Sequence, residues 1–249
     1  MKKTLLIFAI IACFTTKVKA QDNNMFNHLS LGVSVGALDG FGFEVATPIG
    51  NYVNLRAGYS FMPFKHTVDG TKVYKWVEAT EESKFLQETD VELKLRNNAF
   101  KLLFDIHPSV KSAFRFTVGA YIGNSRFVSA VNTDPVADYA DCFIKMGDKR
   151  FGFEGEYAHA HIKVNNFRPY LGVGFGRAIG NKHKSAFNFD LGVQFWGTPE
   201  VYGYDIVDDM YKKLEDADIE DAEGKKALKT LSKISICPVL SVRYMFNIF

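Results

Sequence analysis

The sequence predicts an all-β protein, an eight-stranded antiparallel β-barrel that crosses a membrane. Two observations carry this prediction. In residues 187–195, "FNFDLGVQF", apolar residues alternate with small or polar ones, and a period of two is typical of a strand with two different faces. The same alternation recurs along the chain in eight segments, an even number, and the longer segments reach the ~9–11 residues that a tilted strand needs to cross a bilayer.

The first four segments follow one another through short and long connections. Leu38-Asp39-Gly40 forms a tight turn between the first two, and "TPIGNY" forms a short turn before the third. The fourth is preceded by Val91 to Leu95, whose alternation has the opposite phase, which predicts a β-bulge near Asn97-Asn98. These four segments are 29–37, 41–46, 53–61 and 100–106.

The last four segments show the same arrangement. Short turns, "HPSVKS" and "GNKHK", precede the fifth and the seventh, whereas long connections precede the sixth and the eighth. Short turns that alternate with long loops are typical of outer-membrane barrels, in which the turns are periplasmic and the loops face outward. These four segments are 114–123, 167–176, 187–195 and 234–249.

The chemistry of the two faces separates a membrane barrel from a soluble β-sandwich. One face carries almost no charge, and aromatic residues such as Tyr59 and Phe61 at its ends suit the girdles at membrane interfaces. The other face combines charges with many glycines, which would weaken strands facing bulk water but suit the narrow interior of a small barrel. The predicted lumen charges are Glu44, Arg56, Lys101, Asp105, Arg115, Arg168, Asp190 and Arg243.

The N-terminus reads as a secretory signal peptide. Residues 1–20 combine two early lysines, an apolar stretch and Val18-Lys19-Ala20 before Gln21, which leaves 21–249 as the barrel domain. An alternative is a lipoprotein-like site at Cys13. Cleavage removes four lysines and no acids, so the formal charge changes from +2 to −2, which argues against nucleic acid as a partner.

The sequence also resembles a known family. The signal peptide, the block "FRPYLGVGFGR" and the terminal "SVRYMFNIF" resemble the outer-membrane β-barrel domain family of Gram-negative bacteria, small eight-stranded barrels of the OmpA/OmpX type. This resemblance implies localisation in the outer membrane, contact with its lipid and lipopolysaccharide, and recognition by the barrel-assembly machinery. The implied assembly signal is Tyr244, Phe246 and Phe249, although Phe249 has the opposite parity from the other two.

Two functions of the lumen follow from its charges. Eight strands leave an interior that side chains just fill, so a packed polar plug is favoured, and buried charges must then be paired. The alternative is a narrow or gated conduit. No strand face presents a clear metal site, because His159 and His161 share a face in "AHAHIK" without a third ligand. No cofactor is predicted.

Catalytic motifs are missing from the sequence. It contains neither G-x-S-x-G nor H-E-x-x-H, and Ser125, Ser129 and His161 near one outer end are a set that any loop-rich barrel offers. We therefore expect no enzyme.

Cys142 and Cys237 allow a disulfide between the third outer loop and the rim, or two free thiols.

Three long outer loops remain, 62–90, 128–160 and 197–233. The last has Ile206, Met210 and Leu214 at helical spacing, and Gly224 predicts a division into two short helices. These helices would form either a cap on the rim or a binding surface. The sequence favours a non-enzymatic outer-membrane barrel that serves envelope integrity or binds a surface partner through its loops. The alternatives are a narrow transport barrel for ions or small apolar molecules and, less favoured, a lipid A-modifying enzyme.

Overall fold

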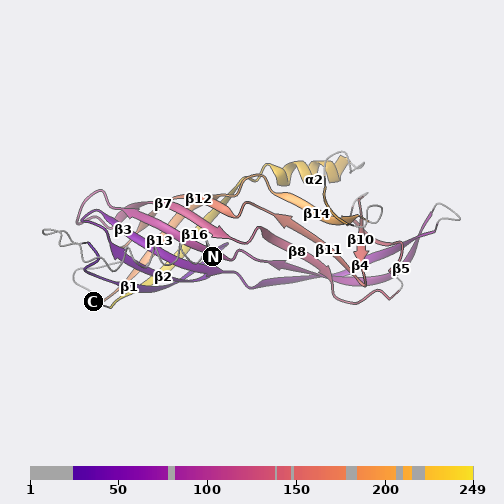
Figure 1. The fold of residues 1–249 in the computed structure, drawn as a ribbon, viewed down its shortest axis with the longest axis horizontal. Helices are drawn as coiled ribbons and strands as arrows, with labels where there is room; N and C mark the ends of the chain where they lie inside the picture. The colour runs from indigo at the N-terminus through magenta and orange to yellow at the C-terminus, as the bar shows by residue number, and fades with distance from the viewer. Residues whose placement is uncertain are drawn as a thin grey trace, which may run out of the picture.

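Two β-structures follow each other along the long axis of the molecule (Figure 1). In this computed structural model, the described residues are 25–77, 82–137, 139–146, 149–177, 184–205, 210–214 and 222–248. The predicted signal peptide, residues 1–20, and Phe249 of the predicted assembly signal lie outside these ranges. The first β-structure is a closed barrel, and the second is a separate eight-stranded sheet, which we call the distal sheet.

The closed barrel contains the eight strands that the alternation predicted, which confirms the prediction of an all-β, eight-stranded antiparallel barrel. The pairing of β1 with β16 closes it, and every neighbouring pair is antiparallel. In chain order the barrel strands are β1 (Ser30–Gly36), β2 (Gly40–Pro48), β3 (Val53–Phe61), β6 (Ala99–Ile106), β7 (Phe114–Gly123), β12 (Phe167–Phe175), β13 (Ser185–Phe195) and β16 (Ile236–Asn247).

The outer wall of the barrel is apolar. Phe43 is 61% exposed, and Phe100 and Phe187 are each 66% exposed, although they are large hydrophobic side chains in regular strands. Successive side chains of a strand point to opposite faces, so the polar residues between them point into the barrel. In β13 the exposed residues Phe187, Phe189 and Leu191 accordingly alternate with buried Asn188 and Asp190.

The turn between β1 and β2 is tight because Gly40 allows it. Gly40 has a φ of +65°, and a Cβ at this position would lie 2.2 Å from the carbonyl oxygen of Phe61. This turn therefore stays at the barrel rim, whereas the other connections at the same end extend into the distal sheet. We call this end the distal rim (Figure 1).

The distal sheet replaces the long loops that the sequence predicted. Its hydrogen-bonded order is β10, β9, β4, β5, β8, β11, β14 and β15, and β10 also pairs with β11, which closes a ring of six strands. The strands are β4 (Phe64–Val77), β5 (Glu82–Leu95), β8 (Arg126–Asn132), β9 (Cys142–Met146), β10 (Lys149–Glu154), β11 (Tyr157–Lys163), β14 (Glu200–Asp205) and β15 (Met210–Lys213).

An apolar cluster fills the inside of this ring. Val73, Ile144 and Phe153 are among its buried members, and Leu93 and Ala130 pack against it. β5 belongs to the distal sheet and β6 to the barrel, with residues 96–98 outside both strands. The opposite phases of these two segments therefore reflect two sheets with different interiors, and the predicted bulge is instead a break between strands.

The predicted helical loop is only partly helical, because two strands, β14 and β15, precede its helix. Met210 begins β15, so the spacing of Ile206, Met210 and Leu214 does not mark a helix, and Ile206 lies outside the described residues. Gly224 lies within α2 (Ala222–Ser232), the one helix that the described ranges contain, rather than dividing two helices. Throughout these ranges, no helix combines the length and the hydrophobicity needed to span a membrane.

Candidate functional site

The lumen of the barrel is the first candidate site, because it collects the predicted charged residues. All eight side chains lie inside the barrel, and none is more than 5% exposed. Each occupies a strand position between two outward apolar residues, as Arg56 does between Leu55 and Ala57. Seven of the eight form one connected set of ion pairs, and Arg168 lies apart from them.

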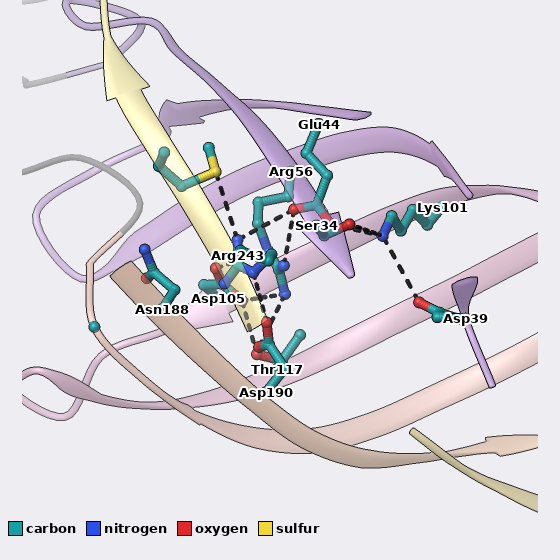
Figure 2. Close-up of polar contacts among 12 residues, drawn as sticks. Ser34, Asp39, Glu44, Arg56, Lys101, Asp105, Thr117, Asn188, Asp190 and Arg243 are labelled. Atoms are coloured by element: carbon teal, nitrogen blue, oxygen red, sulfur yellow. Dashed lines mark hydrogen bonds and ion pairs between the residues drawn. The ribbon is translucent and has the colours of Figure 1, made fainter. Parts of the chain in front are cut away.

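Asp190 connects three arginines from three other strands. Its carboxylate oxygens lie 2.6 Å from Arg115 Nη2, 2.5 Å from Arg243 Nε and 3.5 Å from Arg56 Nη2. Arg115 also donates to the carbonyl of Gly176 at 2.5 Å. These contacts join β13 to β3, β7 and β16 across the interior (Figure 2).

Glu44 and Asp105 complete the set. Glu44 Oε2 lies 3.1 Å from Arg56 Nη1 and 3.1 Å from Arg243 Nη1, and its Oε1 lies 2.6 Å from Lys101 Nζ. Asp105 contacts Arg56 Nε at 2.8 Å and accepts a hydrogen bond from Thr117 Oγ1 at 2.7 Å. Every carboxylate therefore has at least two charged or hydroxyl partners, as buried charges require.

Asp39 is a lumen residue that the sequence did not reveal. It lies in the tight turn between β1 and β2, and its carboxylate accepts hydrogen bonds from Tyr121 at 3.1 Å and from Gln194 at 3.0 Å. Its distance to Lys101 Nζ is 3.7 Å (Figure 2). The alternation rule could not place Asp39, because it describes strands and this residue sits in a turn.

The connected lumen charges balance. Counting Asp39, four acids face four bases, so the set is neutral. Its members are Asp39, Glu44, Asp105, Asp190, Arg56, Lys101, Arg115 and Arg243. We call these eight residues the lumen network.

Arg168 also points into the barrel, near the distal rim, but it is not part of the ion-paired lumen network. Its Nη1 donates to Asn97 Oδ1 at 2.5 Å, and its Nη2 donates to the carbonyl of Asn124 at 3.4 Å. Within the described ranges, no carboxylate lies at ion-pair distance from this guanidinium. Asn97 also donates to the carbonyl of Leu38 at 2.6 Å, so Asn97 links the β1–β2 turn to Arg168 of β12.

The lumen glycines leave room for the large side chains. A Cβ on Gly174 would lie 2.5 Å from Arg115 Nη2, and a Cβ on Gly192 would lie 2.4 Å from the hydroxyl oxygen of Tyr170. Such distances are too short for a side chain, so the space beside these glycines is already occupied. The interior is thus packed around the lumen network, consistent with what eight strands allow.

Of the two alternatives that the sequence left open for Cys142 and Cys237, the structure has the two thiols rather than the disulfide. Cys142 and Cys237 are both buried and are not joined to each other. Cys142 packs in the apolar cluster of the distal sheet, whereas Cys237 packs near the distal rim against Phe127, Val164 and Trp196. A disulfide would require the third outer loop to reach the rim, whereas β9 fixes Cys142 in a different core.

The remaining sequence candidates lie outside the lumen. Tyr244 and Phe246 face outward on β16, 40% and 49% exposed, while Arg243 before them and Met245 between them point inward. His159 and His161 lie on one face of β11, and Ser129 of β8 is directly opposite His161. Among the described residues, no group of three histidine, cysteine or acidic side chains is placed to hold a metal.

A second candidate site is a cleft of about 480 Å³ on the distal sheet. It is lined by residues of β5, β8, β10, β11 and β15, including Arg96 beyond the end of β5. Several of these side chains are basic, and Ser129, His159 and His161 are the lining residues that the sequence analysis had considered. We call it the distal cleft and define it by Lys94, Arg96, Arg126, His159, His161 and Tyr211.

Among known proteins, the chain is similar to solved structures by its fold. No protein-family model matches it, and no curated protein does. Among solved structures it is similar to Acinetobacter baumannii CarO2, with 16% identity and a TM-score of 0.50 over 90% of this chain and 100% of CarO2. It is also similar to Acinetobacter baumannii CarO, with 15% identity and a TM-score of 0.46 over 91% of this chain and 99% of CarO. At 16% identity, the likeness to CarO2 concerns the fold.

Proposed function

We propose that this chain is an integral outer-membrane protein whose barrel is a sealed anchor and whose distal sheet stands outside the membrane. The apolar outer wall supports the membrane location, since side chains such as Phe43 and Phe100 are best accommodated by lipid. The fold shared with CarO2, an outer-membrane protein, supports it as well. In this position the barrel contacts outer-membrane lipid and lipopolysaccharide, and the barrel-assembly machinery inserts it through the outward face of β16.

The lumen network is the observation that carries the proposal. Its ion pairs connect β2, β3, β6, β7, β13 and β16 across the interior, and the turn residue Asp39 joins them near the distal rim. A permeating ion would have to separate pairs such as Asp190 and Arg115, which are already desolvated and matched in charge. We infer that the lumen holds the barrel together and does not conduct.

The function then lies in the distal sheet, in envelope integrity or in the binding of a surface partner, and it is not enzymatic. The sheet has its own apolar core around Val73 and Phe153, so it is an ordered structure that can present side chains at fixed positions. Ordered surface elements on a rigid scaffold are common places for binding. The absence of a catalytic role is part of this proposal.

A narrow transport barrel is the alternative, because charges of both signs line the lumen instead of an apolar core. Conductance of the purified protein in planar bilayers separates the two functions. We expect no steady current steps from the parent protein, and we expect steps from Arg56→Ala/Lys101→Ala, which shortens two central lumen side chains. Leu191→Ala, on the outer wall, is the matched control. Small, reproducible steps from the parent protein would favour transport instead.

A further inference from the structure

We propose that the distal cleft binds a small molecule through an oxyanion group, a phosphate or a carboxylate. This inference deepens the proposed surface-binding function, on which it rests, by naming the site and the chemistry of its ligand. A volume of about 480 Å³ lies within the ~300–1,000 Å³ range of small-molecule sites.

Strand register brings the lining residues together from distant parts of the sequence. Lys94 of β5 pairs with Ser129 of β8, Ser129 pairs with His161 of β11, and His161 pairs with Tyr202 of β14. Paired residues of neighbouring strands point to the same face of a sheet. The four therefore form a row on the outer face, opposite to the apolar face that carries Leu93 and Ala130.

Positive charge dominates the cleft. Lys94 is ion-paired with Glu92, but Arg96 and Arg126 are exposed, and within the described ranges neither guanidinium lies within ion-pair distance of a carboxylate. The one acid of the lining, Glu154, accepts a hydrogen bond from the Tyr211 hydroxyl at 2.9 Å. The cleft thus has two guanidinium groups available for an anion from solution.

One lining residue, His161, belongs to an ordered aromatic set. The His161 ring stacks on Tyr202, with centroids 5.4 Å apart and planes at 6°, and lies 5.6 Å from the Tyr211 ring. His161 is 8% exposed, and its Nε2 has no hydrogen-bond partner among the described residues. A buried ring nitrogen left without a protein partner is unusual and indicates a position for a ligand atom or its hydration.

Burial, with the nearby charges of Arg126 and Lys163, lowers the pKa of His161 to about 4. The imidazole is therefore neutral at pH 7, so the charge of the cleft comes from its lysine and arginines. Guanidinium groups bind phosphate and carboxylate oxygens through two parallel hydrogen bonds, which supports an oxyanion as the recognised group.

Phosphate groups reach the bacterial surface both in soluble metabolites and in lipopolysaccharide, and the experiment separates these sources. Isothermal titration of the detergent-purified full chain is carried out with glucose 6-phosphate, with inorganic phosphate and with gluconate as a carboxylate. A parallel arm uses vesicles that contain lipopolysaccharide, before and after its phosphates are removed. Saturable binding in at least one arm, lost at high salt, is the expected result.

Arg96→Gln/Arg126→Gln tests the site directly. We expect this double variant to weaken binding by about tenfold or more, because each charge-assisted hydrogen bond contributes more than about 1.4 kcal/mol. Lys111→Gln/Lys184→Gln removes the same charge from exposed positions at the opposite end of the barrel and serves as the matched control, with an expected change below about twofold. His161→Phe keeps a ring on the Tyr202 stack and should also weaken binding.

Equal binding by the parent and the Arg96→Gln/Arg126→Gln variant would overturn the inference, as would no binding in any arm. Circular dichroism of each variant confirms that the sheet is intact. Failure of the oxyanion site can be distinguished from failure of the proposed sealed barrel, because the first is measured by binding and the second by conductance. A conducting parent that still binds phosphate through Arg96 and Arg126 would contradict the sealed barrel and leave the distal cleft in place.

Discussion

The barrel and the distal sheet use the same antiparallel strands with opposite insides and outsides. In the barrel, charged residues such as Asp105 and Arg115 are fully buried, while Phe100 and Phe187 are exposed. In the distal sheet, Val73 and Phe153 are buried, while Lys94 and Arg126 lie on the outer face. This inversion shows that the alternation of apolar and polar residues defines the two faces of a strand. The medium around each region then determines which face points inward.

The largest effect is expected from breaking the inside of the barrel. Asp190→Asn removes the charge that three arginines share, and breaking a buried ion pair costs about 3–5 kcal/mol because it leaves a charge uncompensated. Urea unfolding of the refolded protein, followed by its heat-modifiable mobility, measures this cost. Asp69→Asn, an exposed acid of β4, is the control. Similar stability of the two variants would contradict the role of the lumen network.

An effect of similar size, but local, is expected inside the distal sheet. Phe153→Ala removes a buried ring from the apolar cluster, which costs about 3–5 kcal/mol. Hydrogen exchange should rise in β4, β9 and β10 and stay unchanged in the barrel. Phe85→Ala, whose ring is 56% exposed, should change little. If Phe153→Ala also loosened the barrel, the two regions would not be separate cores.

Reversing the outside of the barrel should have the next largest effect. Leu191→Arg places a charge on the outer wall and should cost roughly 2–4 kcal/mol at the centre of a bilayer. Thr67→Arg, at an exposed position of the distal sheet, should stay within about 0.5 kcal/mol. Unfolding in lipid vesicles gives both values. Equal tolerance of the two arginines would mean that water surrounds both regions.

The smallest effect concerns His161 in the distal cleft. Its pKa of about 4 lies below the ordinary value near 6.5, mainly because of burial. The unfolded chain therefore binds the proton more readily, so the contribution of His161 to stability is complete above pH 6.5 and is lost as the pH falls toward 4. The polar or charged residues around it are Lys94, Arg126, Ser129, Glu154, His159, Lys163, Tyr202 and Tyr211.

Nuclear magnetic resonance of selectively labelled histidine measures this titration. Arg126→Gln should raise the pKa of His161, because one of the positive charges that oppose protonation is removed. Bound phosphate should raise it as well. A titration near pH 6.5 in the parent protein would show that the ring is not buried against Tyr202 and Tyr211.

The sequence predicted the barrel well because a closed barrel with a polar lumen and an apolar outer wall requires a strict alternation along each strand. Each barrel strand pairs with two neighbours and separates two media, so Phe187 to Phe195 could be read without knowing the rest of the chain. The charged residues of the lumen could be predicted because they occupy the strand positions between the outward apolar residues. Asp39, Asn97 and Gln194 were missed. Asp39 and Asn97 lie outside the strands, where the alternation gives no information, and Gln194 is an uncharged amide.

The distal sheet was harder to predict for equally physical reasons. In β4 the register shifts between Val68 and Thr71 and again between Val73 and Tyr74, so no uninterrupted period of two survives. Its ring is closed by strands far apart in sequence, such as β4 with β9, whose pairing no local pattern reveals. The distal cleft depends on that pairing, and its basic residues looked like ordinary loop charges.

Nitroxide spin labels at positions 191 and 67, examined in lipid bilayers, test the central claim most directly. At position 191 we predict high accessibility to oxygen and low accessibility to a water-soluble nickel reagent, because the outer wall of the barrel contacts lipid. At position 67 we predict the reverse, because the distal sheet faces water. Free access of the nickel reagent to position 191 would contradict the account.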